Sequence, residues 1–419
     1  MSTAATAAAA RAVRAAASNA SPALPLAVAL AVAPAAAVLQ SKALAPIALL
    51  ALAGCVLRHR QRHGAWPWPR GAAVWAGLAL FAWGAASALW ALQPPKALGT
   101  SAQIGGFFLL GAAACRAVAE DDDAAKRRLM LAASLGLVAG LLLAGLDAAT
   151  GNAVRAAVRG FKEAPPQLVF GLKPAGSAMA LWLPLAAAAP GLSRAWRGLV
   201  LAGGAVVLLL LPGETPKIAV LTAAAAGGAA LLAPRGAPRL LGAFLAAAVL
   251  LMPVALGPVL ARGVPADRIA PSAAHRLLIW DFAAARIAER PLLGWGMEAS
   301  RAVPGHDAHP SPETLRRFGL SDPAAASYLP TAELLPLHPH NGPLQLWLEL
   351  GAPGALLGAA LAFLLGLSAS RAARPEAAAA MLAAGAVTAM LSFGAWQEWW
   401  IGAELMGTAA AAGLPRRNP

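Results

Sequence analysis

The sequence predicts an all-α integral membrane protein with about twelve transmembrane helices and a mostly helical extracytoplasmic segment between the ninth and tenth. Hydrophobic residues make up 59% of the chain and charged residues 12%, against roughly 25% charged residues in a soluble domain. The mean hydropathy is +0.63. Apolar runs of the length that crosses a bilayer recur along the chain, and the loops between them alternate in charge.

Twelve apolar runs are predicted to form the transmembrane helices. They lie near 22–39, 41–57, 71–92, 102–119, 128–149, 174–190, 196–212, 217–233, 238–257, 343–368, 376–395 and 397–414. Nine runs precede the longest polar segment and three follow it. The chain therefore divides into 1–257 with nine helices, a loop domain over 258–342, and 343–419 with three helices.

Clusters of cations follow every second span, whereas the intervening short loops hold isolated cations such as Lys42 and Lys96. The positive-inside rule therefore predicts both termini in the cytoplasm and the loop domain in the periplasm. The net charge of +14 is explained by these loops, because no basic patch interleaved with stacking aromatics indicates nucleic acid. The first span could instead be a signal peptide with Arg11 and Arg14 as its charged region. Its removal would leave an odd number of spans, which would not agree with the alternation of charge in the loops.

Two outer segments are too polar and too long to be simple turns, namely 150–173 and 258–342. Within the second, 275–290 has apolar residues at helical spacing and charges on the other face, which predicts a helix lying on the membrane surface. The stretch 302–337 is rich in Pro, Ser and Asp and is expected to be loop with short helical turns. Near the end of the chain, Trp396, Trp399 and Trp400 are predicted to form an aromatic belt at the outer interface.

The most informative stretch runs from His338 to Pro343, where a polar loop meets an apolar helix. Polar groups at such a position are costly in a membrane and indicate a functional site. If the helix starts at Pro343 with Asn341 or Gly342 as its cap, its free N–H groups point toward the loop and favour an anion. The same dipole favours a neutral imidazole, so His340 is a candidate general base.

These residues resemble the O-antigen ligases and the related O-antigen polymerases, bacterial inner-membrane glycosyltransferases that use polyprenyl-diphosphate sugar donors. The resemblance is carried by His340-Asn341 followed after nine residues by Gly351, by Arg276 and Trp280 leading to Pro291–Gly296, and by Ser392–Trp400. The helix count and the large outer segment also resemble the family's architecture. The family usually carries an Arg between the seventh and eighth spans, where this chain has Lys217, which keeps the charge but loses the planar fork that grips phosphate.

The resemblance implies transfer of a glycan from undecaprenyl diphosphate to an acceptor, foremost the lipid A core of lipopolysaccharide, at the periplasmic face of the inner membrane. Arg276 and Lys217 would bind the diphosphate and neutralise its growing charge, so neither a metal nor another cofactor is expected. Inversion in a single displacement follows if His340 activates the acceptor, since no carboxylate is placed as a covalent nucleophile.

Each assignment has a structural alternative. His338 and His340 could be interfacial residues that only pack, and Arg276 could be a snorkelling cation on an amphipathic helix. Gln345 and Glu349 are four residues apart and share a helix face. They could orient the histidine, or they could only form hydrogen bonds between helices, and for Gln345 we favour the second interpretation.

Three other functions remain open, of which two are glycan transfers to a different acceptor and one is transport. A polymerase of O-antigen or exopolysaccharide, or a protein O-oligosaccharyltransferase, would use the same donor with a different acceptor. A polytopic transporter is the alternative from a different class, but transporters usually place polar residues at the midplane on broken helices in two related halves.

The nearby His306 and His309 lack further ligands at a convincing spacing, which argues against zinc.

Overall fold

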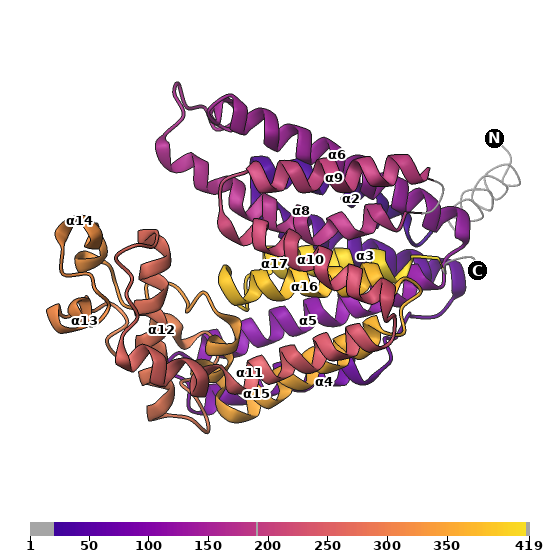
Figure 1. Ribbon diagram of the computed structural model, residues 1–419. Coiled ribbons are helices and arrows are strands. Elements are labelled where there is room, and N and C mark those ends of the chain that lie inside the picture. The colour runs from indigo at the N-terminus through magenta and orange to yellow at the C-terminus, as the bar shows by residue number, and fades with distance from the viewer. Residues whose placement is uncertain (1–20, 190–191, 416–419) are drawn as a thin grey trace, which may run out of the picture.

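The computed structural model describes residues 21–189 and 192–415, and within these ranges the chain is helical and has no strand. Long helices form one bundle, and a smaller group of short helices sits at one end of it (Figure 1). The charged region that would belong to a signal peptide lies outside the described residues.

Each of the twelve predicted spans coincides with a helix. These helices are α2 (Leu24–Leu39), α3 (Leu44–His63), α4 (Ala72–Ala86), α5 (Pro94–Ala119), α6 (Asp123–Ala149), α8 (Leu172–Ala187), α9 (Arg194–Leu210), α10 (Glu214–Leu232), α11 (Gly236–Arg262), α15 (Gly342–Ala369), α16 (Pro375–Leu391) and α17 (Glu398–Ala412). Among the described residues, eight helices are long and apolar enough to cross a membrane, and α2 and α16 are apolar but shorter. The all-α, multi-pass membrane class is confirmed, and the count of twelve crossings stays a prediction.

Small residues allow the helices to approach closely. A Cβ atom at Gly136 of α6 would lie 2.1 Å from the carbonyl oxygen of Leu30 in α2, and one at Gly366 of α15 would lie 2.5 Å from the Cα of Gly242 in α11. Close backbone approach of this kind supplies the van der Waals contact that holds helices together in lipid. The most buried of the spanning helices is α8, which packs against α2, α6, α10 and α16.

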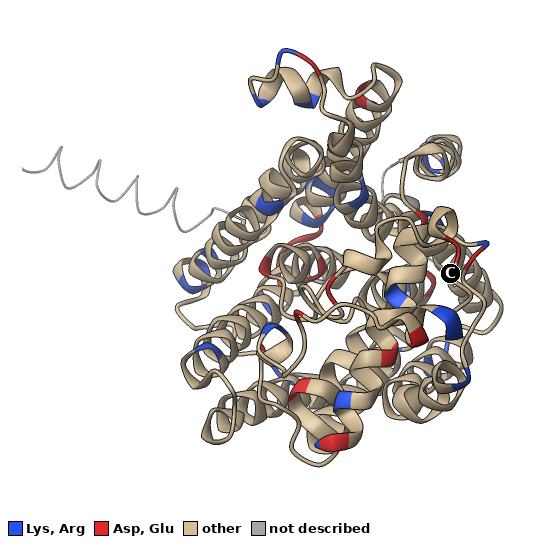
Figure 2. Cartoon of the chain, turned by 90° about the vertical axis from the view of Figure 1, so that its left-hand side faces the viewer, with Lys and Arg blue, Asp and Glu red and all other residues tan. Residues whose placement is uncertain are grey.

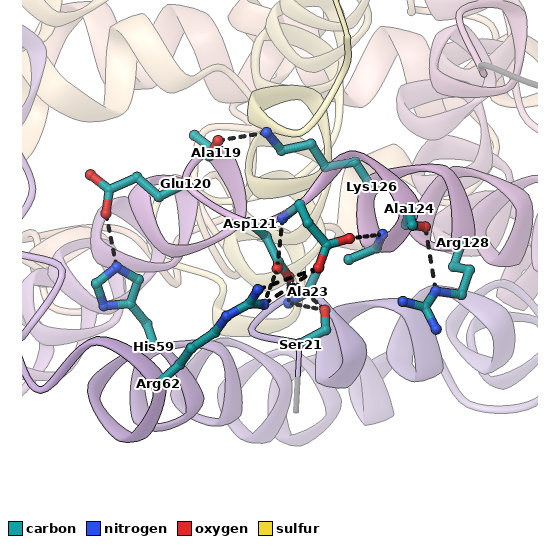
Figure 3. Close-up of polar contacts among 12 residues, drawn as sticks. Ser21, Ala23, His59, Arg62, Ala119, Glu120, Asp121, Ala124, Lys126 and Arg128 are labelled. Atoms are coloured by element: carbon teal, nitrogen blue, oxygen red, sulfur yellow. Dashed lines mark hydrogen bonds and ion pairs between the residues drawn. The ribbon is translucent and has the colours of Figure 1, made fainter. Parts of the chain in front are cut away.

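A polar cluster ties together the end of the bundle that is predicted to be cytoplasmic (Figure 3). The buried Asp121 carboxylate, in the turn between α5 and α6, accepts hydrogen bonds from the Ser21 hydroxyl at 2.5 Å and the Ala23 N–H at 2.8 Å. It also pairs with Arg62 at the end of α3, at 2.7 Å. Next to it, His59 lies 2.8 Å from Glu120. The start of α2 and the cation-rich end of α3 are thus held at the same end as the α5–α6 turn.

The opposite end of the bundle carries the segment between α11 and α15. Its elements are α12 (Pro271–Glu289), η4 (Ala299–Arg301), α13 (Pro312–Arg317), α14 (Pro323–Ala326) and η5 (Leu329–Thr331). The predicted helix at 275–290 and the loop with short turns that follows are therefore confirmed, and α12 crosses the end of the bundle (Figure 1). On the same side, α7 (Ala153–Val158) and η3 (Pro166–Gly171) lead into α8. Viewed from this end, Lys, Arg, Asp and Glu are scattered over the chain without forming one charged face (Figure 2).

The predicted orientation can be tested with reporter enzymes that are active only outside the cytoplasm. Fusions near Asp307, in the segment after α12, should be active, whereas fusions after Arg62 or at Pro419 should be inactive, because the cation-rich loops stay in the cytoplasm. Activity would be measured in whole cells with matched expression levels. An active fusion at Pro419 would contradict the twelve-span topology.

Candidate active site

Two motifs that are separated in the sequence form one backbone junction. Helix α15 is interrupted at Gly351, whose backbone is left-handed with φ 64° and ψ −163°. At this break the carbonyl oxygens of Leu348 and Glu349 are free to accept N–H groups of the 291–296 loop, from Trp295 at 2.9 Å and Gly296 at 2.8 Å. The loop therefore replaces the helical hydrogen bonds that the break removes.

Glycine is required on both sides of this junction. A Cβ atom at Gly351 would lie 2.3 Å from the carbonyl oxygen of Leu292, and one at Gly294, whose φ is 68°, would lie 2.6 Å from the carbonyl oxygen of Glu349. Both distances are shorter than any van der Waals contact, and both backbones are in the region that glycine adopts without strain. Gly351, which is separated from Asn341 by nine residues, is thus the place where the outer loop contacts α15.

The Glu349 carboxylate connects this junction to two other segments. It is fully buried. It accepts hydrogen bonds from the Ser300 hydroxyl at 2.5 Å, the Glu298 N–H at 2.7 Å, the Trp396 indole at 2.6 Å and the Gln345 amide at 3.1 Å. Four donors satisfy both oxygens. Glu349 therefore holds the outer loop and the segment between α16 and α17 against α15.

The segment between α16 and α17 lies beside both histidines. Gln345 accepts the Ala395 N–H at 2.9 Å, so its amide bridges α15 to this segment and does not contact His340. The prediction of an aromatic belt is wrong, because Trp396, Trp399 and Trp400 are at most 9% exposed. Their rings pack inside the bundle, where the Trp396 indole N–H has a carboxylate partner. A tryptophan near a helix end has the same appearance in the sequence whether its ring lies at the membrane interface or inside the protein.

His340 is held in one tautomer. Its Nδ1 lies 2.5 Å from the carbonyl oxygen of Ser392, and a carbonyl only accepts, so Nδ1 carries the proton and Nε2 keeps a lone pair. The backbone of His340 is left-handed, with φ 53°, which is an uncommon conformation for a residue with a Cβ atom. This geometry leaves Nε2 as the atom that could receive a proton.

His338 supports the strained backbone of its neighbour. Its Nδ1 accepts the backbone N–H of His340 at 3.1 Å, and the two ring centroids are 4.2 Å apart. The other face of the His338 ring is covered by Gly394, where a Cβ atom would lie 2.9 Å from the ring. The Gln397 amide lies 3.4 Å from Nε2. His338 is therefore placed to position His340.

The entrance to α15 is fixed by a side chain and by α12. The Asn341 side chain accepts the Leu344 N–H at 3.1 Å and caps the helix, as predicted for this position. The Trp280 indole of α12 donates to the carbonyl oxygen of Pro339 at 2.8 Å. Arg276 is four residues earlier on the same helix, so the face of α12 that carries Trp280 also brings a cation toward the histidine loop.

Burial and neighbouring cations keep both imidazoles neutral. Burial is the largest cause and lowers the pKa of His338 to about 3 and that of His340 to about 4. The hydrogen bond to the Ser392 carbonyl partly opposes this for His340, while the positive charges of Arg276 and Lys173 lower it further. Burial also lowers the pKa of Arg276, which stays protonated at neutral pH. The site therefore combines two fixed positive charges with a neutral imidazole.

A match to a known family covers this part of the chain. Residues 179–359, which run from the middle of α8 through α9, α10, α11 and the outer loop into α15, match a family model described as O-Antigen ligase. This segment of the chain is therefore similar to the O-antigen ligases.

Curated relatives also match a part of the chain. A candidate polysaccharide ligase of Rickettsia conorii is 35% identical over 134 residues, which cover 31% of this chain and 29% of the relative. One of Rickettsia bellii is 32% identical over 161 residues, covering 37% and 36% of the two chains. The matched segment thus spans about a third of these relatives' length. No solved structure matches the chain.

The structure separates the site residues that were predicted from the sequence into two groups. His338, His340 and Arg276 come together at the mouth of α15. Lys217, which was predicted to bind diphosphate in place of the family's usual Arg, lies in the first turn of α10 and pairs with Glu214 at 3.0 Å. Besides Arg276, the cation whose charge acts on both histidines is Lys173, in the first turn of α8, and not Lys217.

Sequence reasoning missed several members of this candidate site. Lys173 ends the polar segment 150–173 and was given no role, although it is the last cation before the apolar span that follows. Ser300 and Trp396 were not connected to Glu349, because their contacts depend on the break in α15. The Ser392 carbonyl is a backbone group, which no residue pattern indicates.

The role of His338 can be tested with two amide substitutions. His338→Asn keeps an acceptor near the place of Nδ1, whereas His338→Gln places its amide near Nε2 and leaves the His340 N–H without its partner. We expect His338→Ala and His338→Gln to lower turnover by up to about tenfold, the value of one neutral hydrogen bond. His338→Asn should retain more activity than either. Equal and complete loss in all three variants would instead indicate that His338 takes part in the proton transfer.

Proposed function

We propose that this protein is a glycosyltransferase that moves a glycan from undecaprenyl diphosphate to an acceptor at the periplasmic face of the bacterial inner membrane. The lipid A core is the acceptor that the family favours. The observation that carries the proposal is the hydrogen bond between His340 Nδ1 and the Ser392 carbonyl, which leaves a lone pair on Nε2 in a site where the charges of Arg276 and Lys173 act on the imidazole.

The reaction is a single displacement. Nε2 of His340 accepts the proton of the acceptor hydroxyl as that oxygen forms a bond to the anomeric carbon of the glycan. The bond from the same carbon to the phosphate oxygen breaks, and its electron pair leaves with the polyprenyl diphosphate. Attack from the face opposite the leaving group inverts the anomeric configuration.

The positive charges act on the leaving group. Its negative charge grows as the glycosidic bond breaks, so cations that are already in place stabilise the transition state more than the ground state. Arg276 is suited to this role because its guanidinium can bind phosphate in a bidentate way. No metal is needed in this mechanism, and activity is expected to survive chelators.

The donor also prepares the base. A histidine with a pKa of about 4 is neutral but weakly basic. The bound diphosphate places negative charge near the imidazole and raises its pKa toward the range where proton transfer is efficient. The acceptor would therefore be activated only when the donor is present, which limits unproductive proton transfer.

A deletion strain tests the proposed function in cells. Loss of the protein should remove glycan from lipopolysaccharide and cause polyprenyl-linked glycan to accumulate, since the donor is still made and exported. Lipopolysaccharide that still carries glycan, but only as short units that are not elongated, would favour a polymerase. Unglycosylated protein would favour a protein O-oligosaccharyltransferase. Unchanged lipopolysaccharide together with a transport defect would favour the transporter alternative.

A further inference from the structure

A lysine outside the matched family segment lies beside the segment that contacts both histidines. Lys173 Nζ is 5.9 Å from the ring centroid of Phe393. Phe393 lies between Ser392, which accepts the His340 Nδ1–H, and Gly394, which covers the His338 ring. Lys173 is thus brought to the histidines by a contact between α8 and the α16–α17 connection.

The stem of Lys173 is held in place by α10. Gly213, at the start of that helix, has a left-handed φ of 106°, and a Cβ atom there would lie 3.2 Å from Cγ of Lys173. The segment between α9 and α10 therefore contributes to the site by covering the aliphatic part of Lys173. Lys217 of the same segment directs its own ammonium to Glu214.

A buried ion pair fixes the chain just before Lys173. Arg155 is fully buried and bonds to Asp147 at 2.6 Å, to the Leu168 carbonyl at 2.6 Å and to the Asn152 side chain at 2.6 Å. These contacts pair the Arg155 guanidinium with a carboxylate and with two further acceptors, so it is not available to bind a ligand. Arg155 consequently orders the outer segment that leads into α8 and leaves Lys173 as the cation that this segment offers to the site.

Lys173 and Arg276 are two like charges without carboxylate partners. None of the ion pairs among residues 21–189 and 192–415 includes either side chain, and both act on the same two imidazoles. The charge of Arg276 also acts on Lys173. Two half-buried like charges that act on one another are stabilised by an anion that carries more than one charge. A diphosphate meets this requirement.

We propose that Lys173, with Arg276, forms the diphosphate-binding site, and that Lys217 contributes less to diphosphate binding than Lys173 does. This inference rests on the proposed function for the identity of the donor, but it makes a separate statement about which side chains bind an inorganic diphosphate. It assigns a binding role to a helix that sequence patterns had given none.

The test compares three lysine variants of the full-length protein in detergent, with inorganic pyrophosphate as the probe. Lys173→Met should weaken pyrophosphate binding by about ten- to a hundredfold, the loss of one or two charge-assisted contacts, and Lys173→Arg should restore most of it. Lys217→Met should have a smaller effect. Lys162→Met removes an exposed cation from the same outer segment and serves as the control.

A second readout does not depend on transfer activity. Removing the Lys173 charge should raise the pKa of His340, because Arg276 and His275 would then be the remaining positive or ionisable neighbours that act on it. The pH dependence of His340 modification by diethylpyrocarbonate, followed by mass spectrometry, should shift to higher pH in Lys173→Met and stay unchanged in Lys162→Met and Lys173→Arg.

The outcomes separate this inference from the proposed function. Unchanged pyrophosphate affinity and an unchanged His340 titration in Lys173→Met would overturn the role of Lys173, and so would a larger loss in Lys217→Met. If the parent protein binds pyrophosphate through Lys173 but transfers no glycan from undecaprenyl diphosphate, the proposed function fails and the binding site stands.

Discussion

Replacing His340 with alanine should lower turnover by about 10² to 10⁴-fold, the usual contribution of a general base. Donor binding should remain, because the cations and the capped entrance of α15 do not depend on the imidazole. Turnover and donor affinity would be measured on purified protein, with His309→Ala as the control, since His309 is an exposed histidine of the outer loop. Full activity in His340→Ala would exclude the proposed base.

The pH dependence gives an independent check on this base. The pKa of His340 is lowered to about 4, so Nε2 is unprotonated above this pH, and kcat/KM should fall as the pH drops through it. A bound diphosphate raises the pKa, so the acid limb of kcat should lie at higher pH than that of kcat/KM. Acid limbs at the same pH in both profiles would mean that the donor's charge does not reach the imidazole.

Substituting Gly351 with alanine should disrupt the fold at the site. The left-handed backbone costs a residue with a Cβ atom about 1 to 3 kcal/mol, and overpacking against the Leu292 carbonyl adds about 1 to 3 kcal/mol. Thermal unfolding in detergent should therefore shift to lower temperature, and the junction with the 291–296 loop should open. Gly294→Ala should act in the same way from the other side of the junction.

Gly145→Ala in α6 is the matched control, because a Cβ atom at Gly145 meets no neighbour within 4 Å. This variant should unfold at the parent temperature or slightly above it, since alanine is the better helix former. If Gly351→Ala is as stable as Gly145→Ala, the break in α15 is not required by the fold.

The helices could be predicted from the sequence because hydrophobic runs and loop charges are local signals. Residue preferences at helix ends predicted a start at Pro343 with Asn341 or Gly342 as the cap, and the structure has Asn341 as the cap and starts α15 one residue earlier, at Gly342. The break within α15 did not follow, because Gly351 reads as one more small residue in an apolar run that is already rich in glycine. Only its contact with the 291–296 loop explains its position.

Interpretations that depended on contacts between distant segments were less successful. Lys173 and Lys217 carry the same charge at the same end of the bundle, and the sequence did not indicate that the charge of one acts on the histidines whereas the other pairs with Glu214. Glu349 could be assigned to one helix face, but its partners come from the outer loop and the α16–α17 connection. The tryptophans near 396–400 were predicted at an interface and are buried.

Glycan transfer with purified protein shows whether His340 is the general base of an inverting transfer. A defined glycan on undecaprenyl diphosphate and lipid A core are mixed with the protein in lipid nanodiscs, in the presence of a chelator, and the product linkage and the released undecaprenyl diphosphate are measured. We expect one inverted linkage for each diphosphate released. We expect this transfer to be abolished in His340→Ala and to be unchanged in His309→Ala. Transfer that proceeds at the parent rate in His340→Ala, or that retains the anomeric configuration, would contradict this expectation.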